Sequence, residues 1–227
     1  MKPPIICSIS APPKSGKTHL ALTFPAPIAV FSFDIGGIAP VRAKFPDKEI
    51  DEFTYPIPII DSDPPKPYAK DVWNKFDADY NKVLEGSKYK TVVLDTSTAI
   101  WEIIRHAVAE QVGQKKLLEV QYTLPNLRMN SLFTRAKVSG LNFVCTQYLR
   151  PIRIDGEATK ELETDGWKRT EAQVDIVLWT ARAVKATREG KKNVIMTTLK
   201  DNRFDLEICG MEIEDADYNK ICALLGF

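Results

Sequence analysis

The first 24 residues carry the feature that most restricts the fold: an apolar run, a loop rich in proline and glycine, and a helix-forming segment in direct succession. The run Ile5–Ile9 has the composition of a buried strand. Residues 11–18 are APPKSGKT, and residues 18–24 have helical composition up to Pro25. A second strand is predicted over residues 28–33. This order predicts a parallel βαβ unit and therefore an α/β fold.

The loop of residues 11–18 fits the phosphate-binding pattern GxxxxGK[ST], with alanine in place of the first glycine. Because it lies between a predicted strand and a predicted helix, its backbone N–H groups can converge on one set of phosphates. We expect Lys17 to face solvent and reach the β- and γ-phosphates, and the Thr18 hydroxyl to complete a Mg²⁺ shell. A chance GKT in a surface turn is the alternative. The predicted contacts of Mg–ATP are Pro13, Lys14, Ser15, Gly16, Lys17, Thr18 and His19.

Asp95 provides the second half of such a site. It ends the β-branched run at residues 91–94, which predicts a buried strand. A carboxylate at the carboxyl end of a strand beside the phosphate loop can hold the metal ion. We therefore predict that Thr18 and Asp95 bind Mg²⁺. The alternative is that Asp95 caps the following helix, since Thr96 and Ser97 also precede it.

The rest of the chain is predicted to add strands and helices to one domain spanning residues 1–227. The proline-rich residues 46–70 are expected to form a long surface excursion, and residues 148–173 a mobile loop or a hairpin. A mostly parallel central sheet flanked by helices, with antiparallel hairpin strands at the C-terminal end, is the fold expected. Strands are predicted at 141–146, 174–179 and 194–199, and helices at 71–84, 98–112, 125–138 and 218–225.

Composition restricts the function less than the motifs do. Lys and Arg total 31 against 30 Asp and Glu, so there is no overall field to gather nucleic acid, and any such contact requires local patches. The four cysteines form no CxxC pair and are interpreted as reduced residues, mostly of the core. No signal peptide and no run of 18 apolar residues is present, so no membrane contact is expected and the expected location is cytoplasmic.

Six segments together resemble the RecA-like ATPases of bacteriophages, which look like shortened relatives of RecA, RadA and KaiC. The segments are APPKSGKT, FSFDIGG, VVLDTST, NFVCTQ, QVDIVLW and LKDNRF, and they span most of the chain. The resemblance implies a role in phage DNA recombination or single-strand annealing, with binding to single-stranded DNA and self-assembly into a ring or filament. It also places the protein in the host cytoplasm.

The resemblance implies roles for further residues. Where the family carries a water-orienting glutamate, this chain has Asp34, which is one methylene shorter and is otherwise a turn residue. Gln147 corresponds to the residue that senses the γ-phosphate. Lys200 and Arg203 resemble cations that enter the neighbouring subunit's ATP site; the alternative is that they solvate a strand end or pair with Asp201 and Asp205. The predicted catalytic set is Lys17, Asp34, Asp95, Gln147, Lys200 and Arg203.

Two groups of cations are candidates for DNA binding. The first follows Gln147 and mixes cations with an aromatic residue, as single-strand grooves do, although acidic residues match the cations in number. The second lies around a predicted hairpin turn and is opposed only by Glu189. A solvated loop and a solvated hairpin tip are the alternatives. The groups are Arg150, Arg153, Trp167, Lys168 and Arg169, and Arg182, Lys185, Arg188, Lys191 and Lys192.

Three functions remain open from the sequence. The favoured one is an ATPase of DNA recombination, an enzyme whose hydrolysis of ATP is slow or stimulated by DNA. A nucleotide-gated assembly factor or helicase loader is the second, and a P-loop small-molecule kinase the third. Arg150 and Arg153 could form the lid of a kinase, but Gln147 and the LKDNRF segment have no obvious kinase role.

Overall fold

A computed structural model describes residues 3–33, 36–58, 66–187 and 190–227. Within that part of the chain, nine strands form one sheet, in the order β3-β2-β4-β5-β1-β7-β8-β9, with β6 paired to β5 outside this path. Six strands run parallel, and β6, β8 and β9 pair in antiparallel fashion. The parallel strands are β1 (Ile6–Ala11), β2 (Ile28–Ser32), β3 (Ile50–Thr54), β4 (Thr91–Asp95), β5 (Asn142–Ile154) and β7 (Ile176–Thr187).

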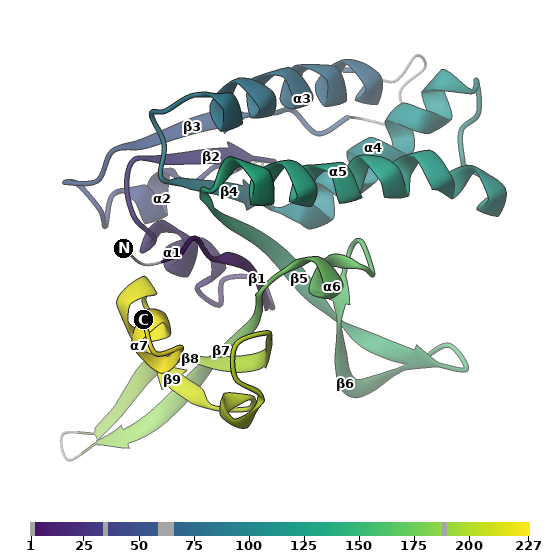
Figure 1. Cartoon of the computed structure of the whole chain (residues 1–227). Helices are drawn as coiled ribbons and strands as arrows, with labels where there is room; N and C mark the ends of the chain where they lie inside the picture. The colour runs from purple at the N-terminus through teal and green to yellow at the C-terminus, as the bar shows by residue number, and fades with distance from the viewer. Residues whose placement is uncertain (1–2, 34–35, 59–65, 188–189) are drawn as a thin grey trace.

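Helices cover both faces of the sheet, which is why the central strands β1, β2 and β4 are buried at every position (Figure 1). One face carries the long helices α3, α4 and α5, and the other carries α1 and α7. Phe31 and Phe76 are fully buried on the first face, and Ile9 and Phe24 on the second. The helices are α1 (Lys17–Leu22), α2 (Ala39–Arg42), α3 (Ala69–Glu85), α4 (Ser97–Gln111), α5 (Thr123–Ser139), α6 (Thr170–Gln173) and α7 (Tyr218–Leu224).

The expected fold class is confirmed, including the antiparallel strands at the C-terminal end. These are β6 (Glu157–Asp165), β8 (Gly190–Asn202) and β9 (Glu212–Glu214), with short 3-10 turns η1 (Glu119–Tyr122) and η2 (Leu206–Ile208) between elements. β5 continues past its predicted end to Ile154 and returns as β6, so the hairpin alternative describes much of residues 148–173. No helix in the described part of the chain is long and apolar enough to cross a membrane.

One prediction of the fold is wrong in part. Within the expected surface excursion of residues 46–70, β3 forms a parallel edge strand against β2. Phe53 of β3 stacks on Phe31, with 5.1 Å between ring centroids. Prolines at positions 46 and 56 stand outside this strand, so they bound it and remove no ladder hydrogen bond.

Candidate functional site

The phosphate loop follows β1 directly and leads into α1, as its sequence predicts. Gly16 has φ of 88°, in the left-handed region that favours glycine. A β-carbon there would also lie 3.2 Å from Cγ2 of Ile195. Glycine at this position is therefore favoured by the backbone conformation, and the close approach of the Ile195 side chain leaves little room for a β-carbon.

Lys17 is buried, contrary to the expectation that it faces solvent. Lys17 as a whole is 6% exposed, and its Nζ donates hydrogen bonds to the carbonyl oxygens of Ala11 and Pro12, both at 3.2 Å. The ammonium also lies 4.3 Å from the ring centroid of Tyr148. These contacts hold the lysine inside the curve of the loop, with its charge satisfied by carbonyl groups and an aromatic face.

Asp95 and Thr18 come together at the same end of the sheet. The hydroxyl of Thr18 donates to Oδ2 of Asp95 at 3.0 Å, and the hydroxyl of Thr146 donates to Oδ1 at 2.5 Å. The cap of α4 is Thr96, whose hydroxyl accepts a hydrogen bond from the N–H of Ala99. Capping therefore does not account for Asp95, and its carboxylate remains turned toward the loop.

These oxygen donors fit Mg²⁺. Among the described residues, no group of three or more His, Cys, Asp or Glu side chains could enclose a metal ion. Mg²⁺ suits such a site, because it commonly takes one or two protein ligands and completes its shell with water and phosphate oxygens. Thr18 and Asp95 are the residues that would hold it.

A pocket of about 750 Å³ opens around the loop. All seven residues predicted to contact the nucleotide, 13–19, line it, together with Asp95. Burial lowers the pKa of His19, Lys44 lowers it further, and Asp215 opposes them. The other lining residues were not predicted as nucleotide contacts, because they lie outside the phosphate-loop motif and come from several elements: Leu20, Gly37, Val41, Lys44, Thr96, Tyr148, Arg182, Ile195, Thr197, Asp215 and Ala216.

Gln147 and Tyr148 lie at the point where β5 leaves the parallel sheet, beside Ser10 and Ala11 of β1. Gln147 is fully buried, and its Nε2 donates to the hydroxyl of Thr170 at 3.3 Å. It does not line the pocket, whereas Tyr148 does. The residue after the predicted sensor is thus the one in direct contact with Lys17.

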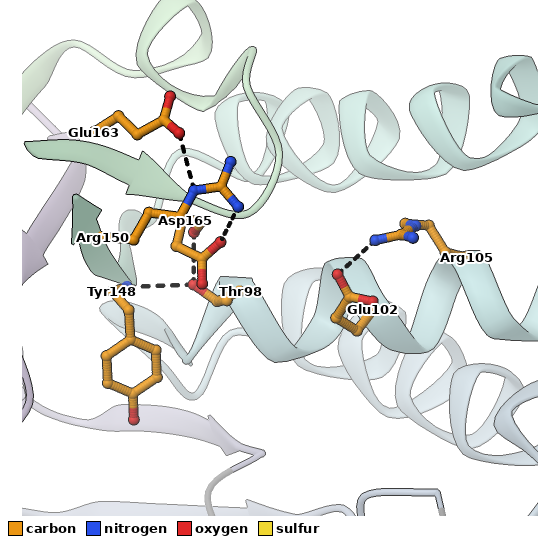
Figure 2. Close-up of polar contacts among 7 residues, drawn as sticks. All are labelled: Thr98, Glu102, Arg105, Tyr148, Arg150, Glu163 and Asp165. Atoms are coloured by element: carbon orange, nitrogen blue, oxygen red, sulfur yellow. Dashed lines mark hydrogen bonds and ion pairs between the residues drawn. The ribbon is translucent and has the colours of Figure 1, made fainter. Parts of the chain in front are cut away.

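The base of the β5–β6 hairpin is tied to α4 (Figure 2). The hydroxyl of Thr98 accepts from the N–H of Tyr148 at 3.2 Å and donates to the carbonyl of Asp165 at 2.7 Å. Arg150 pairs with Glu163 at 2.9 Å and with Asp165 at 3.3 Å. Figure 2 also shows that the Arg105–Glu102 pair belongs to α4 alone. One polar network therefore joins the pocket's Tyr148 to both strands of the hairpin.

The first group of DNA-binding candidates is divided by the structure. Lys168 and Arg169 are exposed, and Arg153 donates to the carbonyl of Gly156 at the hairpin turn. Trp167 is only 3% exposed, stacks on Phe133 and donates from Nε1 to Asn126. Trp167 was predicted to be a DNA contact, but in this structure its ring is part of the core and is not exposed for a contact with nucleic acid.

The second group is more neutralised than its sequence indicates. Lys185 pairs with Glu214, and Lys192 lies 3.9 Å from Asp215, so acidic groups other than Glu189 oppose these cations. Both acidic residues come from the β9 region, which pairs with β8. Lys191 is exposed. Arg188 lies outside the described residues.

Lys200 lies near the C-terminal end of β8 and Arg203 directly after it, past the residues of β8 that lie near the phosphate loop. Ile195 of β8 contacts Gly16, whereas Asn202 pairs with Ile176 at the start of β7. Arg203 forms an ion pair with Asp175 at 2.6 Å, and Lys200 lies over the ring of Trp179. Neither cation lines the pocket of its own chain. The predicted catalytic Asp34 lies outside the described residues.

Comparisons with known proteins agree with this architecture. A family model described as AAA domain matches residues 4–168. The crystal structure of the RadB recombinase is similar over 93% of this chain and 86% of that one, with a TM-score of 0.55 and 16% sequence identity. At 16% identity this likeness shows the fold alone, which is RecA-like. No curated protein sequence matches the chain.

Proposed function

Since the chain belongs to the AAA-domain family, we propose that it is a RecA-like ATPase that binds Mg–ATP in the pocket around Lys17. The observation that carries the proposal is that Lys17, Thr18 and Asp95 line one cavity. Oγ1 of Thr18 lies 3.0 Å from Oδ2 of Asp95. The loop provides backbone N–H groups and a cation for phosphates, and the paired oxygens provide ligands for a metal ion. Few ligands other than a nucleoside phosphate need all of these groups.

In this proposal each residue of the site has a defined part. The ammonium of Lys17 would exchange the carbonyls of Ala11 and Pro12 for phosphate oxygens. Thr18 and Asp95 would hold Mg²⁺, which would neutralise phosphate charge. Asp34 orients the attacking water, and Gln147 responds to the γ-phosphate through its neighbour Tyr148. Hydrolysis is slow or stimulated by DNA, because the water-orienting carboxylate is shorter than the family's glutamate.

We further propose that the protein acts on single-stranded DNA during phage recombination or annealing, in the host cytoplasm. The support is the resemblance of the six sequence segments and the presence of exposed cations on two hairpins. Backbone contacts by such cations are independent of base sequence and weaken with salt. The proposed contacts are Arg150, Arg153, Lys168, Arg169, Arg188, Lys191 and Lys192.

Self-assembly belongs to the same proposal. Lys200 and Arg203 do not line the pocket of their own chain, which supports a contact with the nucleotide of a neighbouring subunit. We propose that they enter that neighbour's site in a ring or filament. Mixing inactive Arg203→Ala and Lys17→Ala proteins tests this, because a hybrid interface joins an intact phosphate loop to an intact Arg203. No recovery of turnover in the mixture contradicts the shared site.

The primary test is nucleotide binding and turnover by the wild-type protein and by Lys17→Ala, with and without single-stranded oligonucleotide. The proposal expects ATP binding that needs Lys17, and turnover that rises with DNA. Equal ATP affinity in a folded Lys17→Ala protein would contradict it. Phosphorylation of an added small-molecule acceptor would instead indicate a kinase.

A nucleotide-gated assembly factor is the second candidate, and one observation favours it. Among the described residues that line the pocket, the carboxylates are Asp95 and Asp215. Asp95 is engaged by Thr18 and Thr146, and Oδ1 of Asp215 accepts from the N–H of Ile195. Both carboxylates therefore already have contacts that position neighbouring groups, which favours a switch that binds ATP and hydrolyses it slowly. Tight ATP binding without DNA-stimulated turnover would identify this function.

A further inference from the structure

The β7–β8 hairpin rests directly on the phosphate loop. The hydroxyl of Thr180 donates to the carbonyl of Ser15 at 2.7 Å, and Nε of Arg182 donates to the carbonyl of Lys14 at 2.8 Å. Ile195, which pairs with Arg182 across the hairpin, lies under Gly16. These contacts join β7 and β8 to three consecutive residues of the loop, so the hairpin's base forms one wall of the pocket.

Arg182 differs from three other cations in and after the β7–β8 hairpin. Lys185, Lys192 and Arg203 each form an ion pair with a carboxylate. Arg182 lines the pocket and is exposed, and its structural contact within the described part of the chain is the carbonyl of Lys14. A guanidinium has five N–H donors, so the bond from Nε leaves four on the two terminal nitrogens. The contact therefore fixes the side chain while its charge and most of its donors stay available.

We propose that Arg182 binds the phosphate chain of the nucleotide held by its own subunit. This inference rests on the proposed function, since it assumes a nucleoside phosphate in the pocket. Arg182 is anchored to Lys14, which lies inside the phosphate loop, so its terminal nitrogens are near the anion that the loop encloses. A planar guanidinium can give two parallel hydrogen bonds to phosphate oxygens. The pocket then has a second cation in cis, in addition to Lys17 and independent of Lys200 and Arg203.

If Arg182 contacts the phosphate chain, its replacement should weaken the binding of any ligand that carries that chain, whether or not the ligand has a base. Arg182→Gln removes the charge but keeps an amide donor that can reach the Lys14 carbonyl. Affinity for ATP and for inorganic triphosphate should each fall by about tenfold or more, as expected for losing hydrogen bonds between charged groups. The matched control is Lys137→Gln, which removes one exposed positive charge from α5, away from the pocket. It should leave both affinities unchanged.

Titration of the wild type, Arg182→Gln, Arg182→Lys and Lys137→Gln with both probes tests the proposal, with thermal melting as a check of folding. We expect affinity to decrease from the wild type to Arg182→Lys to Arg182→Gln. If the two Arg182 variants bind equally, or if ATP alone is affected, the phosphate contact is overturned. If the wild-type protein binds ATP and the variants match it, this inference fails alone. If the wild type binds neither ATP nor triphosphate, the proposed function itself fails.

A mixing experiment separates this cation from one supplied by a neighbour. Because Arg182 and Lys17 act on the same bound nucleotide, a mixture of Arg182→Gln and Lys17→Ala should recover no turnover beyond the sum of its parts. Recovery in that mixture would show that Arg182 acts across an interface and would overturn its assignment to its own subunit's site.

Discussion

Asp175 contacts Ile6 at the start of β1 and Arg203 just after the end of β8. Comparing the two contacts by mutation can distinguish a structural role of Arg203 from a catalytic one. The Asp175 side chain is 9% exposed. Its Oδ2 accepts from the backbone N–H of Ile6 at 3.1 Å, and its Oδ1 lies 2.6 Å from Nη1 of Arg203, whose side chain is 63% exposed. The bond to Ile6 is buried, whereas the bond to Arg203 is only partly buried and has an exposed partner, so the two should differ in energy.

The structure sets the size of each effect. Asp175→Ala removes a charge-assisted bond to a buried amide, worth about 1.5–3 kcal/mol. The ion pair with Arg203 adds only about 0.2–1 kcal/mol, because water screens an exposed partner. Asp175→Ala should therefore lower the free energy of unfolding by about 2–4 kcal/mol. Arg203→Ala should lower it by at most about 1 kcal/mol.

Urea denaturation of the wild type and both variants measures these differences. Equal costs for Asp175→Ala and Arg203→Ala would refute the reasoning, because the energy would then lie in the exposed pair. The comparison also controls the mixing experiment with Lys17→Ala. If Arg203→Ala remains folded under assay conditions, a loss of assembly-stimulated turnover cannot come from unfolding.

Three further changes test other contacts. Gly16→Ala should lower the free energy of unfolding by about 1–2 kcal/mol through its left-handed φ alone. Adding Ile195→Ala should restore only the further loss that comes from the contact between the new β-carbon and Ile195, as thermal or urea unfolding would show. Lys48→Met should lower the free energy of unfolding by about 1–2 kcal/mol, because Nζ of Lys48 donates to three carbonyls at the end of α1; an unchanged urea midpoint would contradict this. Burial lowers the pKa of both His19 and His106, so on acidification these side chains are protonated in the unfolded chain at a higher pH than in the folded protein. Their contribution to stability should therefore be full above about pH 6.5 and fall below it. The double Gln variant should show a weaker dependence of the melting temperature on pH over this range.

The sequence predicts those parts of the fold and site that depend on local signals. The phosphate loop is a continuous motif within the first 18 residues, and Asp95 is marked by the apolar strand that it ends. Both could therefore be located without knowing which residues they contact in the fold. Tertiary pairing determines the rest. Trp167 stands in a polar stretch, and its burial depends on Phe133 and Asn126 of α5. Arg182 could be recognised as a cation, but not as part of the pocket, because the register of β7 beside β1 cannot be read from either strand.

The position of β1 in the sheet accounts for how the two hairpins relate to the pocket. β1 lies between β5 and β7, and each neighbour continues past the loop into a hairpin (Figure 1). The β5–β6 hairpin reaches the pocket through Tyr148, whose ring contacts the ammonium of Lys17. The β7–β8 hairpin instead holds carbonyls of the loop itself through Thr180 and Arg182. A nucleotide that draws Lys17 away from Tyr148 would therefore alter the first hairpin's contacts while the second continues to brace the loop. If DNA binding depends on ATP, the β5–β6 hairpin is the one whose cations should show that dependence.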